Sequence, residues 1–180
     1  MPTLTEERRT EALSDFSVEG PTLVCFVCTG NTCRSPMAEA VFNHLFRVPP
    51  ICTACATEVT PKKPFRAVSA GFYGSGDPIA ANAVRALEEA GIPSAPDNDY
   101  KNHVSRPINP EIMETADIVV GLTESHAMQL MGWFPSCASK ITCMPHSIPD
   151  PFGGDEEDYA ACLAAITEGI KELFLTEDNR

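Results

Sequence analysis

A cysteine and an arginine stand at the spacing of a phosphate-binding loop close to the start of the chain. Five residues separate Cys28 from Arg34, a hydroxyl residue follows, and an apolar run precedes the cysteine, giving the sequence VCFVCTGNTCRS. A loop of this length can wrap around a tetrahedral oxyanion, with its backbone N–H groups pointing inward and the positive end of the next helix behind them. The arginine adds two parallel hydrogen bonds, and these positive partners favour a thiolate. The spacing predicts phosphoryl transfer to sulfur, with Cys28 as nucleophile and Arg34 as phosphate clamp.

The remaining loop residues are the candidate contacts to the substrate. Their backbone N–H groups can hold the equatorial phosphate oxygens, and their side chains can shape the entrance. We therefore expect substrate contacts from Thr29, Gly30, Asn31, Thr32, Cys33 and Ser35.

Asp150 is the candidate proton donor. Transfer of a phosphoryl group to a thiolate needs an acid that protonates the leaving atom. The segment SIPDPFGG around Asp150 is stiffened by two prolines, can turn at two glycines, and follows a predicted strand. An isolated Asp-Pro pair is more often a simple turn, but together with the upstream loop it predicts a catalytic carboxylate. Asp150 would protonate the leaving group and then activate water against the phosphocysteine.

Apolar strands alternate with helices along the rest of the chain. Strands are predicted at 22–27, 66–70, 118–122 and 139–143. Helices are predicted from the N-cap Ser35 and Pro36 to about 47, over 79–91, 110–115 and 123–131, and along the apolar stripe 159–173. This pattern predicts an α/β three-layer sandwich with a four-stranded parallel sheet, and ligands of such sheets bind at the carboxyl ends of the strands.

Composition limits the classes of function. The 180 residues suffice for one domain, and the formal net charge of −12 disfavours nucleic-acid binding. Residues 1–20 are polar and acidic without the apolar core of a secretory signal, and no stretch is long enough to span a membrane. We expect a cytoplasmic monomer with an acidic, flexible extension over 1–20, a phosphatase domain over 21–176 that contains a loop insertion at 48–64, and a tail over 177–180.

The motifs together resemble the low-molecular-weight protein tyrosine phosphatases. The similarity covers roughly residues 22–175 and is carried by VCFVCTGNTCRSPMAEAVF, RAVSAGF, NHVSRPI, ADIVVGLT and DPFGG. It implies a metal-independent, cofactor-free phosphatase acting on phosphorylated proteins. It also implies that Asn31 and Ser35 shape the loop and support the thiolate. His103 would hydrogen-bond the loop asparagine, the alternative being an ordinary surface-loop histidine.

Two features favour phosphoarginine over phosphotyrosine as the substrate. The chain is most similar to the bacterial protein arginine phosphatases, which carry threonine at the position of Thr32, whereas tyrosine-directed members tend to carry isoleucine. After Asp-Pro the chain has Phe152 and two glycines, where tyrosine-directed members often place adjacent tyrosines as a wall for the substrate ring. The alternative is a tyrosine phosphatase in which Thr32 only packs. Tyr73 is expected to line the pocket, or else to be an exposed loop aromatic.

The cysteines raise three further hypotheses. Cys33 could form a reversible disulfide with Cys28 that protects the nucleophile from over-oxidation. Cys25 and Cys162 lie among apolar residues and are predicted to be buried thiols. Cys52 and Cys55 could join two downstream cysteines around zinc, but the spacing is unusual and two loop thiols are the favoured interpretation.

Two other classes of protein are less consistent with the sequence. A thiol-coupled arsenate reductase needs additional relay cysteines, and residues 56–136 contain none. A non-catalytic phosphoprotein-binding module would have lost the nucleophile or the acid, whereas Cys28, Arg34 and Asp150 are all present.

Overall fold

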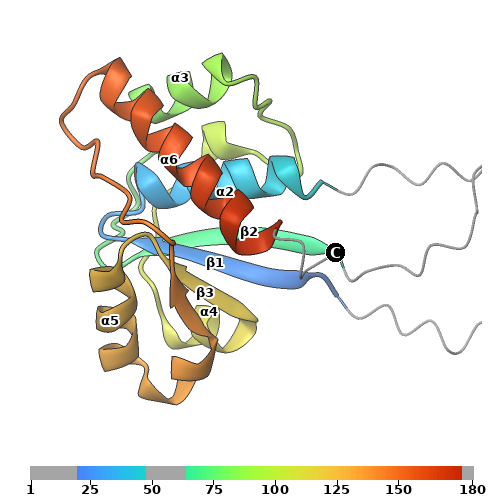
Figure 1. Ribbon diagram of the computed structural model, residues 1–180, viewed down its shortest axis with the longest axis vertical. Coiled ribbons are helices and arrows are strands. Elements are labelled where there is room, and N and C mark those ends of the chain that lie inside the picture. The colour runs from blue at the N-terminus through green and yellow to red at the C-terminus, as the bar shows by residue number, and fades with distance from the viewer. Residues whose placement is uncertain (1–19, 48–63, 176–180) are drawn as a thin grey trace, which may run out of the picture.

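Four parallel strands form the centre of the molecule (Figure 1). The computed structural model describes residues 20–47 and 64–175. The strands lie in the order β2-β1-β3-β4, with bounds β1 (Thr22–Cys28), β2 (Phe65–Gly71), β3 (Ile118–Gly121) and β4 (Ile141–Cys143). Residues 24–28 of β1 are buried, as expected for a strand that is covered by helices on both faces.

Helices cover both faces of this sheet. Helices α2 (Arg34–Leu45), α3 (Ala81–Glu89) and α6 (Glu156–Phe174) pack on one face, and α4 (Pro110–Thr115) and α5 (Glu124–Trp133) pack on the other (Figure 1). Two short 3-10 helices, η1 (Tyr100–Asn102) and η2 (Pro135–Lys140), lie in the connections. The face under α2, α3 and α6 holds the larger apolar core, and that under α4 and α5 the smaller one. The predicted α/β three-layer sandwich with a four-stranded parallel sheet is confirmed.

The carboxyl ends of β1, β2 and β3 meet at one edge of the sheet. Cys28 at the end of β1 pairs with Gly71 of β2, and Val27 pairs with Gly121 of β3. A Cβ atom on Gly71 would lie 2.8 Å from the backbone nitrogen of Asn31, so only glycine lets β2 approach the loop after β1 this closely. The sheet therefore brings the predicted loop to the point where the strand order changes direction, which is the usual ligand site of such folds.

A group of phenylalanines anchors α2 at the other end of the core. Phe42 is completely buried, and its ring contacts those of four other phenylalanines at centroid distances of 4.4–5.9 Å: Phe26, Phe46, Phe65 and Phe174. These contacts join α2 to β1, β2 and α6. The helix that carries Arg34 is thus fixed by packing far from the loop.

The structure confirms two of the helix ends predicted from the sequence and contradicts a third. The Thr123 hydroxyl caps α5 by accepting the His126 N–H, and Gly91 follows α3 with a positive φ of 73°, both as predicted. The prediction that Ser35 caps α2 is wrong, because α2 begins at Arg34 and the Ser35 hydroxyl lies 3.2 Å from the carbonyl oxygen of Ala70 instead. A partner on β2 outweighs the local preference of serine for a helix N-terminus.

The last strand is shorter than predicted. Residues 139 and 140 belong to η2, and only Ile141–Cys143 pair with β3. The predicted extension over 1–20, the insertion over 48–64 and the tail fall almost entirely on residues outside the described ranges. Among the residues that the structure describes, no helix is long and apolar enough to cross a membrane.

Candidate active site

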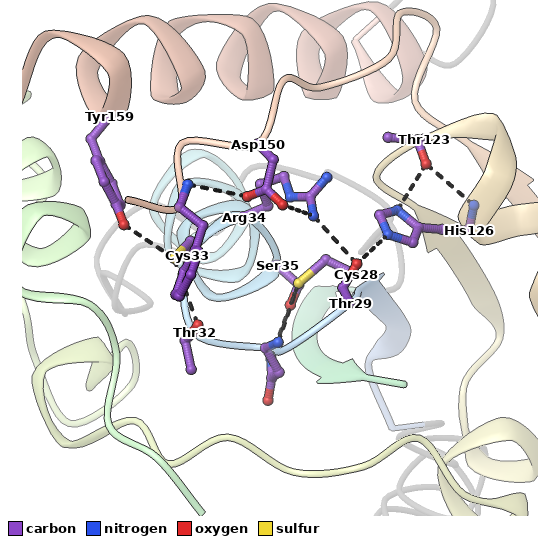
Figure 2. A network of polar contacts seen from close by, with 12 residues as sticks. Cys28, Thr29, Thr32, Cys33, Arg34, Ser35, Thr123, His126, Asp150 and Tyr159 are labelled. Atoms are coloured by element: carbon purple, nitrogen blue, oxygen red, sulfur yellow. Dashed lines mark hydrogen bonds and ion pairs between the residues drawn. The ribbon is translucent and has the colours of Figure 1, made fainter. Parts of the chain in front are cut away.

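The loop between β1 and α2 holds the Cys28 sulfur at its base (Figure 2). The backbone N–H of Asn31 donates to this sulfur at 3.3 Å, and the Ser35 hydroxyl oxygen lies 3.0 Å from it. Cys28 is 2% exposed and faces the loop interior. The Asn31 N–H is a donor to this buried sulfur, and the Ser35 hydroxyl, which here also reaches the Ala70 carbonyl oxygen, becomes a second donor when its proton turns to the sulfur. Such donors stabilise the negative charge that a cysteine nucleophile requires.

Asn31 organises the loop from within. It is fully buried and adopts a positive φ of 57°, a left-handed conformation that asparagine tolerates better than most residues. Its side-chain amide donates to the hydroxyls of Ser35 and Ser69 at 2.9 Å each, and its side-chain oxygen accepts the backbone N–H of Arg106. The Nε2 atom of His103 lies 2.9 Å from the Asn31 carbonyl oxygen. The structure thus brings His103 to the loop asparagine, where the resemblance placed it.

Arg34 and Asp150 form an ion pair across the mouth of the loop (Figure 2). The Arg34 Nη2 atom donates to Oδ2 of Asp150 at 2.8 Å, and the backbone N–H of Phe152 donates to the other carboxylate oxygen at 3.2 Å. The arginine side chain is only 8% exposed, whereas the aspartate side chain is 50% exposed. Asp150 is therefore the partner that can move, and Arg34 belongs to the floor of the site.

A cavity of about 250 Å³ opens above the Cys28 sulfur. It is lined by Cys28, Thr29, Gly30, Thr32, Cys33, Arg34, Asp150 and Phe152. Phe152 is 78% exposed, so its ring stands at the rim. Most of the predicted substrate contacts line this cavity, while Asn31 and Ser35 lie buried beneath the loop.

Tyr73 lies outside this cavity, contrary to the prediction. Its backbone N–H is held by the Thr29 carbonyl oxygen at 2.9 Å, but its side chain is 66% exposed. The neighbouring Phe72 is the residue that turns inward, where it stacks on the His126 ring. The alternative that the sequence left open, an exposed loop aromatic, describes Tyr73.

A second cavity, of about 280 Å³, lies behind the loop. Its lining includes His103, Arg106 and Glu39, and no cysteine is among its lining residues. Burial raises the pKa of Glu39, although the hydrogen bond from Ser69 opposes this shift. The chemistry of a cysteine nucleophile therefore belongs to the cavity above Cys28.

Cys33 is turned towards α6 and away from the base of the loop. Its sulfur lies 3.2 Å from the Tyr159 hydroxyl and 3.6 Å from the Thr32 hydroxyl (Figure 2). Burial, and next the hydrogen bond to Cys33, raise the pKa of Tyr159, so the phenol stays protonated. Cys28 and Cys33 are both free thiols here, and their reversible disulfide stays a prediction.

The other cysteines divide into buried and surface thiols. Cys25 and Cys162 are completely buried, as predicted, and burial raises the pKa of each to about 12. Cys137 and Cys143 are free and partly exposed. Cys52 and Cys55 lie outside the described residues. Within 20–47 and 64–175, no three histidine, cysteine or acidic side chains are grouped to hold a metal ion.

Sequence reasoning missed His126, which lies beside the loop (Figure 2). Its Nε2 atom is 3.1 Å from the Thr29 hydroxyl oxygen, and its Nδ1 atom is 2.9 Å from that of Thr123. Thr29 also accepts a hydrogen bond of 3.4 Å from Arg34. Burial, and next the positive charge of Arg34, lower the pKa of His126 to about 4, so the ring is neutral at neutral pH. No local signal reveals this contact, because Thr29 and His126 are 97 residues apart.

Comparison with known proteins identifies the family. The model of the family described as low molecular weight phosphotyrosine protein phosphatase matches residues 23–179. The chain belongs to this family of protein phosphatases. It is 33% identical to a protein-arginine-phosphatase of Bacillus subtilis over 87% of this chain and 99% of that protein. It is 30% identical to the human low molecular weight phosphotyrosine protein phosphatase over 76% and 83% of the two chains.

Solved structures give the same result for the fold. The YwlE arginine phosphatase from Geobacillus stearothermophilus superposes with a TM-score of 0.69 at 28% identity, over 85% of this chain and 90% of that one. The family and the fold are therefore those that the sequence motifs predicted.

Proposed function

We propose that this protein hydrolyses phosphorylated protein side chains through a phosphocysteine at Cys28. The Cys28 thiolate attacks phosphorus, a sulfur–phosphorus bond forms, and the bond from phosphorus to the leaving atom breaks. Arg34 and the loop amides bind the equatorial oxygens, whose charge is greatest in the transition state. Asp150, at the mouth of the same cavity, gives its proton to the leaving atom. The observation that supports this most strongly is the convergence of these three side chains on one small cavity.

The second half of the reaction restores the enzyme. Asp150 is now a carboxylate and accepts a proton from a water molecule that attacks the phosphocysteine. The sulfur–phosphorus bond breaks, inorganic phosphate leaves, and Cys28 returns to the thiolate that Asn31 and Ser35 stabilise. The same carboxyl group thus serves as acid and then as base.

Phosphoarginine is the substrate that this site favours. Asp150 already holds a guanidinium group, that of Arg34, at 2.8 Å. When Arg34 turns its N–H groups to a bound phosphate, Asp150 is free to face the guanidino group of the substrate. Once its proton has passed to the leaving nitrogen, its carboxylate and the departing guanidinium form a charge-assisted pair. The cavity wall supplied by Thr32 carries a hydroxyl that lies near Gly30 across the loop. The acidic rim that Asp150 supplies suits a guanidinium better than a phenyl ring.

Phosphotyrosine is the second candidate, and Phe152 is the observation that favours it. An exposed aromatic ring at the rim can stack on a substrate ring. The human relative named above is a phosphotyrosine phosphatase.

A comparison of two matched phosphopeptides separates these candidates. We would measure kcat/KM on peptides that differ only in phosphoarginine or phosphotyrosine, for the wild type and for Thr32→Ile, with reductant present. The proposal expects a preference for phosphoarginine that falls at least tenfold in the variant, because isoleucine removes the hydroxyl and places a larger apolar side chain in the cavity wall. A preference for phosphotyrosine that the variant leaves unchanged would assign the site to the second candidate.

A further inference from the structure

A series of hydrogen-bonding side chains runs from Thr123 to Arg34 and crosses from one face of the sheet to the other. Thr123 and His126 belong to the start of α5, Thr29 follows β1, and Arg34 begins α2. The contacts are 2.9 Å from Thr123 to His126, 3.1 Å from His126 to Thr29, and 3.4 Å from Thr29 to Arg34 (Figure 2). The proposed reaction uses Arg34 but assigns no role to the histidine.

We propose that His126 is a positioning residue for the phosphate clamp, holding the Arg34 guanidinium in the loop through the Thr29 hydroxyl. This inference rests on the proposed function, in which Arg34 binds the phosphoryl oxygens. His126 is not among the residues lining the cavity above Cys28, so it acts on the arginine and not on the substrate.

The donors and acceptors along this series of side chains allow this role. A guanidinium can only donate, so the Thr29 oxygen accepts from Arg34 and its own hydroxyl proton is free to go elsewhere. A neutral histidine offers one donor and one acceptor. With Nδ1–H donating to Thr123, the Nε2 atom accepts the Thr29 proton, and the lone pairs of the Thr29 oxygen are left to Arg34. The histidine thereby fixes the rotation of the Thr29 hydroxyl.

The catalytic cycle creates the need for such an anchor. Arg34 Nη2 carries two hydrogens, and in this structure it donates to Asp150 at 2.8 Å and to Thr29 at 3.4 Å. Asp150 must leave Arg34 to protonate the leaving group. Among the side-chain hydrogen bonds of Arg34 within the described residues, only the one to Thr29 then remains. A fixed Thr29 keeps the guanidinium over the loop while the carboxylate moves.

The histidine is itself held rigidly. Its ring is stacked on Phe72 with centroids 6.0 Å apart and an interplanar angle of 25°. The start of α5 lies against the end of β3, where a Cβ atom on Gly121 would be 2.6 Å from the Ala127 nitrogen. A rigid support is what lets a residue outside the cavity control the direction of one inside it.

Two amide substitutions separate this role from helix capping. The amide of His126→Asn reaches the place of Nδ1 and keeps the contact to Thr123, whereas that of His126→Gln reaches the place of Nε2 and keeps the contact to Thr29. Thr29→Val removes the hydroxyl at equal size. The probe is inorganic phosphate, whose binding we would measure by calorimetry, with KM and kcat for an aryl phosphate in parallel.

The proposal expects phosphate binding to weaken about tenfold in His126→Asn and in Thr29→Val, which is the usual effect of losing one hydrogen bond. His126→Gln should stay within about threefold of the wild type, and Thr29→Val combined with His126→Asn should be no weaker than either alone. The melting temperature of each variant reports folding independently. Weakening in His126→Gln but not in His126→Asn, or additive losses in the double variant, would overturn the proposal. If the wild type binds phosphate with this pattern yet hydrolyses no phosphopeptide, the proposed function fails and the positioning role stands.

Discussion

Replacement of Asp150 by asparagine tests the acid step, because it changes the reaction much more than the fold. Asparagine keeps the shape of the side chain and an oxygen for the Phe152 N–H. It loses the ion pair to Arg34, but half of the Asp150 side chain is exposed, so that pair contributes at most about 1 kcal/mol to stability. The melting temperature should therefore change little.

The rate effect is expected to be larger and to depend on the leaving group. A positioned general acid contributes about 10²–10⁴ in rate, which corresponds to about 3–5 kcal/mol of barrier. For aryl phosphates whose leaving phenolates need no proton, Asp150→Asn should lose little in phosphoenzyme formation. For poor leaving groups, the variant should form the phosphoenzyme more slowly by the full factor of about 10²–10⁴. Phosphate binding should not weaken, because the substitution removes a negative charge 2.8 Å from the clamp.

The assay is rapid-quench measurement of phosphoenzyme formation across a series of aryl phosphates. A steeper dependence of the rate on leaving-group basicity in the variant than in the wild type supports the assignment. Equal losses for good and poor leaving groups would refute it, since a missing acid cannot slow a step that needs no proton.

Three further predictions concern the nucleophile and the fold. Cys28→Ser should abolish turnover while the circular dichroism spectrum and the melting temperature stay close to those of the wild type; normal turnover would exclude the mechanism. Phe42→Ala should destabilise the protein by about 3–5 kcal/mol in denaturant unfolding, because it empties the centre of a cluster of five rings. The folded pKa of His126 is about 4 against 6.5 when free, so the unfolded chain binds the proton between these values and stability falls as pH drops through this window. In His126→Gln, up to about 3 kcal/mol of this pH-dependent change in the free energy of unfolding should disappear. Identical stability–pH profiles of wild type and variant would show that His126 is not its source.

The parts of the site that follow each other in sequence could be predicted from the sequence. Cys28 and Arg34 lie in one loop, so their spacing alone indicates an oxyanion cradle. Asp150 could be predicted because a parallel sheet returns every strand's carboxyl end to the same edge. The alternation of apolar strands with helices predicted the three layers, because each apolar face must pack against another element.

The missed features depend on contacts between distant residues. Ser35 has the sequence of a helix cap, but Ala70 on β2 supplies a competing acceptor. Phe72 and Tyr73 are adjacent aromatics, and packing against His126 and Trp133 decides that Phe72 is the one that turns inward. The His126 contact to Thr29 exists because β1 and β3 are neighbours, which is a property of the topology and of no local motif.

The central claim is that the phosphoryl group passes through the Cys28 sulfur, and direct trapping tests it. We would mix the wild-type protein with a phosphoarginine peptide labelled in its phosphoryl group, quench within milliseconds, and locate the label by peptide mapping under conditions that preserve phosphothiols. The account predicts label on the peptide that contains Cys28, lost in Cys28→Ala, which leaves no nucleophilic atom at this position. Turnover of the peptide with no label on Cys28, or with label on another residue, would contradict it.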